Sequence, residues 1–349
     1  MTEKDYSGAT TSKIGKNAKS SSNSKPSAMM ETKKSEKTRS ETKESNESTI
    51  FKSQISDYKK AGEIMTKVVA FSKQLIKPNM KLNEIAEKIE AEILKLGGDL
   101  AFPVNLSIDD VAAHYTPTLR DEKLATGLLK VDIGVHVNGF VADYAFTLDL
   151  TPEKKYTKLI EASKKALEKA LEIVKAKKSE STLTEIGGAI QKEIQKHGFT
   201  PIVNLSGHSL DEFNIHAGIT IPNVENTSPK TLGEGAFAIE PFATLSTANG
   251  LVYDGAGGNI YHLSGAGQVR DNTAREIITW IIENKKGLPF SQRELERKYG
   301  TKALIAISAL KRSGIIQEYA QLVEKSHSPV SQAETSLVVY QGKVEILAD

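Results

Sequence analysis

The sequence predicts an α+β fold in which helices are interleaved with antiparallel hairpins. Four segments place apolar residues at helical spacing, and four others alternate or run apolar in the way that strands do. One pair of strand-like runs is joined by Asn138-Gly139, a preferred sequence for a two-residue hairpin turn. Helices packed beside antiparallel strands of this kind are typical of an α+β domain, and we find no internal repeat that favours another architecture.

Apolar periodicity identifies the helices. In the first of them, Ile64, Val68 and Phe71 recur three to four residues apart, which places them on one face. Glycine follows the second and the fourth helix, at Gly97 and Gly198, and glycine commonly ends a helix. These four helices are expected at residues 55–75, 82–96, 156–177 and 184–196.

The strand-like segments are short and rich in Val, Ile, Phe and Leu. Two of them flank the Asn138-Gly139 turn, the third ends after Pro241, and the fourth lies near the end of the sequence. These strands are expected at residues 129–137, 140–148, 236–242 and 336–347.

Residues 269–325 differ from the rest, because three short helices are followed there by strand-like residues, an order typical of a winged helix-turn-helix. Ser291 and Glu294 have the spacing of a capping box at the start of the second helix. DNA binding is one interpretation, but basic residues such as Lys311 and Arg312 are too few to favour it. We favour a compact insert that shapes the rim of a site elsewhere. Its helices are expected at residues 274–284, 292–298 and 303–311.

The composition is that of a globular chain without cysteine. With 349 residues, of which 39% are hydrophobic, the chain can bury a substantial core. The absence of cysteine excludes disulfides, zinc fingers and cysteine proteases, so carboxylates and imidazoles are its strong metal ligands. The formal net charge of +2 gives no global argument for nucleic acid as the main partner. No apolar run reaches the ~20 residues of a membrane helix, and we expect a cytoplasmic protein without a membrane partner.

Residues 1–49 are rich in Lys, Ser, Thr and Glu and contain almost no large apolar side chain. Such a segment buries too little apolar surface to offset the entropy of ordering it, so we expect a disordered tail. Its lysine-rich blocks are suited to contacts with ribosomal RNA, or are simply solvated, and both interpretations remain open.

The hairpin centred on Asn138-Gly139 places two carboxylates together. If its strands pair directly across the turn, Asp132 and Asp143 lie diagonally on the same face, and the opposite face is apolar and packs in the core. Two buried acids this close need a proton or a cation to neutralise them. We favour a metal site, and a surface hairpin with two incidental aspartates is the alternative. His136 shares this face but lies near the turn, which favours a hydrogen-bonding or exposed histidine over a ligand.

Histidines and glutamates elsewhere supply further candidates. His208 and His216 are separated by a short polar loop, and either metal ligation or hydrogen bonding within the loop explains such a pair. Glu240 interrupts an apolar run and Glu334 precedes one, which is unusual for a carboxylate unless it faces water or a cation. Together with the two aspartates and one imidazole, these two glutamates form an oxygen-rich set suited to two adjacent divalent ions.

The motifs that carry these residues resemble those of a known family. Over about residues 50–349 the chain is similar to the type 2 methionine aminopeptidases, which have the pita-bread (creatinase-like) fold. The insert between Glu240 and Glu334 favours type 2, because type 1 enzymes lack it. Five segments match the metal-ligand motifs of the family in order, namely Val131-Asp132-Ile133-Gly134, Ala142-Asp143-Tyr144-Ala145, Ser206-Gly207-His208-Ser209, Ala238-Ile239-Glu240-Pro241 and Ala333-Glu334-Thr335. Two further segments match its substrate-contacting histidines, namely Ala112-Ala113-His114-Tyr115-Thr116-Pro117 and Ile215-His216-Ala217-Gly218.

The resemblance implies a domain organisation and a role for each of these residues. A catalytic pita-bread domain should comprise residues 50–268 and the C-terminal strands at 326–349, with the winged-helix-like insert at 269–325 between them. Two divalent ions, Co, Mn, Fe or Zn, should be held by Asp132, Asp143, His208, Glu240 and Glu334. Catalysis should involve His114, His216 and Glu240. The substrate pocket should include His114, His216, Phe102, Ile215 and Tyr319, with Ile260 as a neighbour.

The resemblance also implies an activity, which is the removal of the initiator methionine from nascent polypeptides that have a small second residue. The expected protein is a monomer that acts on nascent chain N-termini, with the ribosome as a further candidate partner and no DNA. Two alternatives remain. A proline dipeptidase of the same fold carries the same ligands but lacks the insert. A non-catalytic homologue that binds RNA or protein would have lost ligands that this chain retains.

Overall fold

The computed structural model describes residues 32–348, with side chains from residue 54 onward. The chain divides into two compact units, Met1–Phe51 and Lys52–Asp349. Most of the predicted tail, residues 1–49, lies outside the described residues, and its last part, from Thr32, is helical and belongs to α1 (Thr32–Leu75). Among the described helices, none is both long and apolar enough to span a bilayer.

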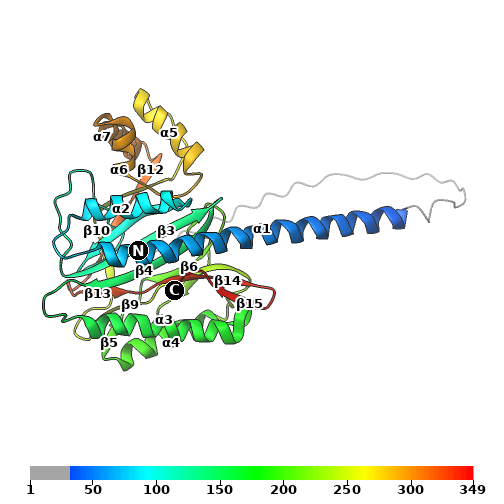
Figure 1. Ribbon diagram of the computed structural model, residues 1–349, viewed down its shortest axis with the longest axis horizontal. Helices are drawn as coiled ribbons and strands as arrows, with labels where there is room; N and C mark the ends of the chain where they lie inside the picture. Colours follow the sequence, from blue (N-terminus) through cyan, green and yellow to red (C-terminus); the bar gives the residue numbers. More distant parts are fainter. Residues whose placement is uncertain (1–31, 349) are drawn as a thin grey trace, which may run out of the picture. The chain divides into compact units, whose positions relative to one another are not determined.

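The four predicted helices are confirmed. Residues 55–75 lie within α1, and the other three have bounds within one residue of those expected. Helix α4 begins with a capping box of Thr182 and Glu185, which fixes its first turn. Helices α3 and α4 pack on each other and, with β5, β9 and β13, form one side of the fold, whereas α2 packs on β1 (Figure 1). The bounds are α2 (Leu82–Lys95), α3 (Thr157–Lys177) and α4 (Leu183–Lys196), with a short 3-10 turn, η1 (Lys178–Glu180), between the last two.

The strands of the described chain form four small antiparallel sheets. The first contains β1 (Asp99–Ile108), β3 (Leu128–Val137) and β4 (Phe140–Asp149) in that order. The second has the order β15 (Lys343–Ile346), β14 (Thr335–Tyr340), β8 (Gly235–Ile239), β6 (Ser206–Leu210) and β7 (Thr220–Pro222). The third is β13 (Val330–Gln332), β9 (Phe242–Leu245) and β5 (Phe199–Pro201). The fourth is β11 (Phe290–Ser291), β10 (Val252–Leu263), β12 (Ile316–Glu324) and β2 (Val111–Ala113).

Two predicted strands are each broken in the structure. The segment 236–242 is divided at Glu240-Pro241 into β8 and β9, which belong to different sheets, because proline has no N–H to continue the ladder. The segment 336–347 is a hairpin rather than one strand, with its turn at Gln341 and Gly342, both of positive φ. The first break matters for the site, because it leaves Glu240 at a strand end.

The insert contains the three predicted helices, α5 (Asn272–Asn284), α6 (Gln292–Tyr299) and α7 (Lys302–Arg312). The predicted capping box of Ser291 and Glu294 is present at the start of α6. These helices gather beside β12 (Figure 1) and bury an apolar cluster of their own that includes Ile277, Leu295 and Leu310. The insert is therefore a small packed body whose helices lie between β10 and β12 in the chain. Its winged-helix character stays a prediction.

Candidate metal centre and substrate pocket

The β3–β4 hairpin has the predicted register. Its turn residues Asn138 and Gly139 have φ values of 53° and 93°, as a type I′ turn requires, and Asp132 and Asp143 face Ala145 and Gly134. Both acids thus lie diagonally on one face, and the apolar residues of the opposite face are almost all buried. A side chain at Gly134 would lie 2.4 Å from the Phe102 ring, so glycine allows that ring to pack beside the acids.

His136, on the same face near the turn, is buried and accepts a hydrogen bond from the Gly139 N–H at 3.1 Å. It also packs edge-to-face on the ring of Phe213. Of the two interpretations that the sequence favoured, a hydrogen-bonding or an exposed histidine, the structure shows the first, because the ring is hydrogen-bonded and buried.

The other three predicted ligands come from the five-stranded sheet. His208 lies on β6 opposite Ala238 of β8, Glu240 directly follows β8, and Glu334 directly precedes β14. Hydrogen bonds join this sheet to the hairpin, because the Glu334 N–H donates to the Ala145 carbonyl at 2.9 Å. Strand pairing within one sheet and bonding between two thus bring ligands from distant parts of the sequence together.

All five predicted ligands line one pocket. Ligand atoms of Asp143, His208 and Glu334 lie within 4.8 Å of one another, and Glu240 Oε1 is 3.6 Å from His208 Nε2. The Gln332 amide donates to Glu240 Oε2 and Glu334 Oε2 at 3.4 and 3.3 Å, which orients both carboxylates. The five side chains therefore converge on one pocket, as a shared metal site requires.

The electrostatics of the pocket favour a cation. Burial raises the pKa of the Asp132 carboxyl to about 7, and burial together with neighbouring carboxylates raises the pKa values of Asp143, Glu240 and Glu334. Burial lowers the pKa of His208 to about 3, which keeps its imidazole neutral and able to bind a metal. Asp132 Oδ1 and Asp143 Oδ1 are buried without a hydrogen-bond partner in the described structure. Carboxylate oxygens that are crowded, buried and without donors fit a divalent metal.

The six predicted substrate-side residues line the same pocket. The His216 and His208 ring centroids are 4.6 Å apart, and the His114 ring lies 5.3 Å from that of Tyr319. His114 directly follows β2, and burial lowers its pKa to about 4, so its imidazole is neutral near pH 7. We call the five ligands the carboxylate side of the pocket, and we call its remaining imidazoles and apolar groups the substrate side, which consists of Phe102, His114, Ile215, His216, Ile260 and Tyr319.

Sequence reasoning missed four residues at the site, namely Asn105, Ala113, Pro289 and Gln332. Asn105 lines the pocket from β1, opposite Asp132, and Pro289 lines it from the segment before β11. Gln332 orients two of the ligands. For Gln332 a signal existed, because a residue two positions before Glu334 in an extended segment points to the same face. No comparable signal marks Asn105, because the bulged pairing of β1 with β3 cannot be read from local pattern.

Known proteins are similar to this chain in sequence and in fold. A family model described as Metallopeptidase family M24 matches residues 56–273. The chain belongs to metallopeptidase family M24. It is 40% identical over 294 residues to a methionine aminopeptidase of Pyrococcus horikoshii, which covers 83% of this chain and 97% of that relative. It is also 36% identical over 316 residues to methionine aminopeptidase 2 of Lodderomyces elongisporus, covering 83% of this chain and 65% of that one.

The crystal structure of a methionine aminopeptidase from Thermotoga maritima superposes with a TM-score of 0.58 at 19% identity, covering 84% of this chain and 96% of that one. At this identity the likeness concerns the fold, which is the pita-bread fold of M24 peptidases, as predicted. This M24 member is therefore a metal-dependent peptidase.

Proposed function

We propose that this M24 peptidase is a type 2 methionine aminopeptidase that uses two divalent ions to release the N-terminal methionine of polypeptides with a small second residue. The observation that carries the proposal is that all five ligand motifs and all the predicted substrate residues line a single pocket. Two relatives named methionine aminopeptidase match 83% and 82% of this chain. The helical insert between Glu240 and Glu334, and the relative named methionine aminopeptidase 2, support type 2.

The ligand side would hold the two ions through Asp132, Asp143, His208, Glu240 and Glu334. The candidate ions are Co, Mn, Fe and Zn, because oxygen and imidazole ligands accept each of them. When bound, they supply Lewis acidity and lower the pKa of water toward ~7, which gives a nucleophile at neutral pH. The Gln332 amide holds two of these carboxylates in place for that task.

The remaining steps belong to the side chains around the ligands. Glu240, whose Oε1 lies 3.6 Å from His208 Nε2, would take the proton of the attacking water and pass it to the leaving amine nitrogen as the C–N bond breaks. His114 and His216 line the same pocket, where neutral imidazoles would donate hydrogen bonds to the oxygen of the scissile carbonyl as it gains negative charge. Donors that are already in place need no reorganisation when that charge develops.

The methionine side chain is placed in the apolar part of the pocket, between Phe102, Ile215, Ile260 and Tyr319. A thioether packs well against aromatic rings and branched aliphatic groups. We place the substrates among the N-termini of newly made cytoplasmic polypeptides, and the protein acts on them as a monomer.

The proposal is tested with two peptides that differ only in the second residue. The metal-reconstituted chain should release methionine from Met-Ala-Ser but not from Met-Lys-Ser, and chelation of the metal should abolish the reaction. Release of proline from a dipeptide such as Gly-Pro, without release of methionine, would assign the chain to proline dipeptidases instead. Metal binding without turnover of any of these peptides would favour a non-catalytic homologue.

A further inference from the structure

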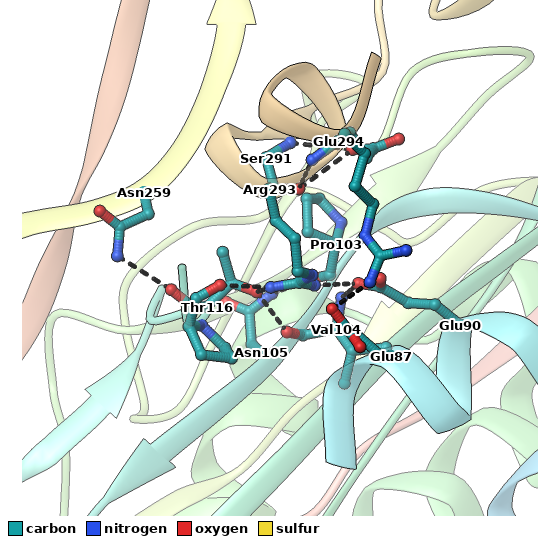
Figure 2. Close-up of polar contacts among 12 residues, drawn as sticks. Glu87, Glu90, Pro103, Val104, Asn105, Thr116, Asn259, Ser291, Arg293 and Glu294 are labelled. Atoms are coloured by element: carbon teal, nitrogen blue, oxygen red, sulfur yellow. Dashed lines mark hydrogen bonds and ion pairs between the residues drawn. The ribbon is translucent and has the colours of Figure 1, made fainter. Parts of the chain in front are cut away.

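Arg293 of the insert is a charged side chain with only 1% of its surface exposed. Its guanidinium lies between helix α2 and the segment that follows β2 (Figure 2). It donates to the Glu90 carboxylate, to the Pro117 carbonyl and, at 3.3 Å, to Thr116 Oγ1. Burial of a guanidinium is unfavourable unless it is paired, so these bonds fix its position.

The segment that Arg293 contacts begins at His114. The φ angle of His114 is 65°, in the left-handed region that residues other than glycine rarely adopt. A backbone of this kind persists only where its surroundings hold it. The orientation of this pocket histidine therefore depends on what restrains the residues next to it.

Thr116 is restrained on three sides. Its N–H donates to the Gly258 carbonyl at 3.0 Å, and its hydroxyl donates to the Val104 carbonyl at 2.8 Å. Its carbonyl accepts from the Asn259 amide at 2.9 Å (Figure 2). Strands β1 and β10 thus hold one part of the segment, and Arg293 holds its hydroxyl and the next carbonyl. The insert therefore contributes to the segment from α6, in addition to the contacts made by β1 and β10.

Gly258 shows how tightly β10 approaches this segment. A Cβ at that position would lie 1.9 Å from the His114 carbonyl oxygen, so only glycine allows the two backbones to touch. This close approach restrains the backbone at His114, which lies in the same segment as Thr116 and Pro117.

We propose that Arg293 is a positioning residue that holds His114 toward the substrate through Thr116 and Pro117, so that the insert supports the rate of the reaction. Its effect on catalysis rests on the proposed function. Its effect on the segment does not, and the two effects can be measured separately.

Arg297 provides a matched control. It lies one turn further along α6 and also pairs with α2, through Glu87. Its side chain is 55% exposed, and its ion pair lies on the solvent side of the same interface. Loss of Arg297 therefore removes an ion pair between the insert and α2 without removing a bond to the segment after His114.

The test compares Arg293→Gln with Arg297→Gln in the metal-loaded full chain, with Met-Ala-Ser as substrate. Arg293→Gln should lower kcat about tenfold with KM changed less than about twofold, because a small displacement of a catalytic group is costly for rate. Arg297→Gln should change both by less than about twofold. The double variant of His114→Ala and Arg293→Gln should have a kcat within about twofold of that of His114→Ala alone, because the effect of Arg293 passes through His114. Metal content should equal that of the wild type throughout.

Hydrogen exchange measures the restraint without reference to activity. The amides of residues 114–117 should exchange faster in Arg293→Gln than in Arg297→Gln or the wild type. If Arg293→Gln does not fold because Glu90 is left buried and unpaired, Arg293→Lys carries the test. A lysine keeps the positive charge but cannot span the same acceptors, so about a threefold loss of kcat with faster exchange is expected.

Equal loss of kcat in the two arginine variants, or losses that multiply in the His114→Ala background, would overturn the proposal. Unchanged exchange at residues 114–117 in a folded Arg293 variant would overturn it as well. If the wild type releases no methionine, the proposed function fails, and the exchange comparison still decides whether Arg293 holds the segment.

Discussion

The two sides of the pocket are built in different ways. The carboxylate side comes from strands, or residues directly at strand ends, in two sheets that hydrogen bonds join. The substrate side combines a loop histidine, His114, with Ile260 and Tyr319 from the strands that lead into and out of the insert. Strand register and hydrogen bonds between the two sheets place the first side, whereas the second also depends on a loop histidine that packing between distant segments holds. The two sides should therefore respond differently to substitution, with metal lost from one and rate or affinity from the other.

The largest effect is expected on the carboxylate side. Asp143→Asn should lower the bound metal well below that of the wild type and lower kcat/KM by about 10³ or more, because Asp143 shares the site with His208 and Glu334. Elemental analysis and the Met-Ala-Ser assay measure both. Glu345→Gln, on an exposed ion pair with Lys59, is the control and should retain metal and rate. Full metal content with normal turnover in Asp143→Asn would contradict the assignment.

On the substrate side, His114→Ala should lower kcat by about 10² while the metal content stays at the wild-type value, since the imidazole acts on the carbonyl and not on the metal. Replacing His327, an exposed histidine paired with Asp110, by alanine is the matched control. Loss of metal together with rate in His114→Ala would remove the distinction between the two sides.

A smaller effect is expected where the side chain of the substrate lies. Ile215→Ala removes part of the apolar wall and should raise KM for Met-Ala-Ser about five- to tenfold with little change in kcat, because one or two methylene contacts contribute on this scale. The exposed Ile305 of α7, replaced by alanine, should leave both constants unchanged. An effect on kcat alone would mean that Ile215 does not contact the bound methionine.

The smallest effect concerns stability. Burial lowers the pKa of His114 to about 4, with His216 adding to the shift and Asp254 opposing it. Between that value and about 6.5 the unfolded chain binds more protons, so the folded state loses stability as pH falls through this interval. The measurement is the free energy of urea unfolding of the metal-free wild type and of metal-free His114→Gln, at pH 7 and at pH 5. From pH 7 to pH 5 the variant should lose less stability than the wild type, by on the order of 1 kcal/mol. An identical pH dependence in both proteins would show that His114 titrates normally.

Features that a local sequence pattern determines could be predicted, whereas features that depend on contacts between distant segments could not. The Asn138-Gly139 turn determines the register of the hairpin, so the diagonal placement of Asp132 and Asp143 could be predicted from the sequence alone. The helices could also be predicted, because a buried helical face leaves a periodic pattern in the sequence. These are local signals.

The remaining features depend on contacts that local pattern does not encode. The change of sheet at Pro241 was missed because an apolar run does not reveal which sheet each part joins. The turn at Gln341 is different, because Gly342 marks it in the sequence and this local signal was not used. Asn105 and Arg293 were missed for the same reason as the change of sheet, since their importance comes from the pairing of β1 with β3 and from the docking of α6 on α2.

The most direct test of the central claim is a crystal structure of the chain loaded with Mn²⁺ or Co²⁺, with the ions located by anomalous scattering. We expect two ions about 3.5–4 Å apart, with Asp143 and Glu334 contacting both and Asp132, His208 and Glu240 completing the two sites. Ions bound elsewhere, or a single ion that leaves these carboxylates without a metal, would contradict the claim.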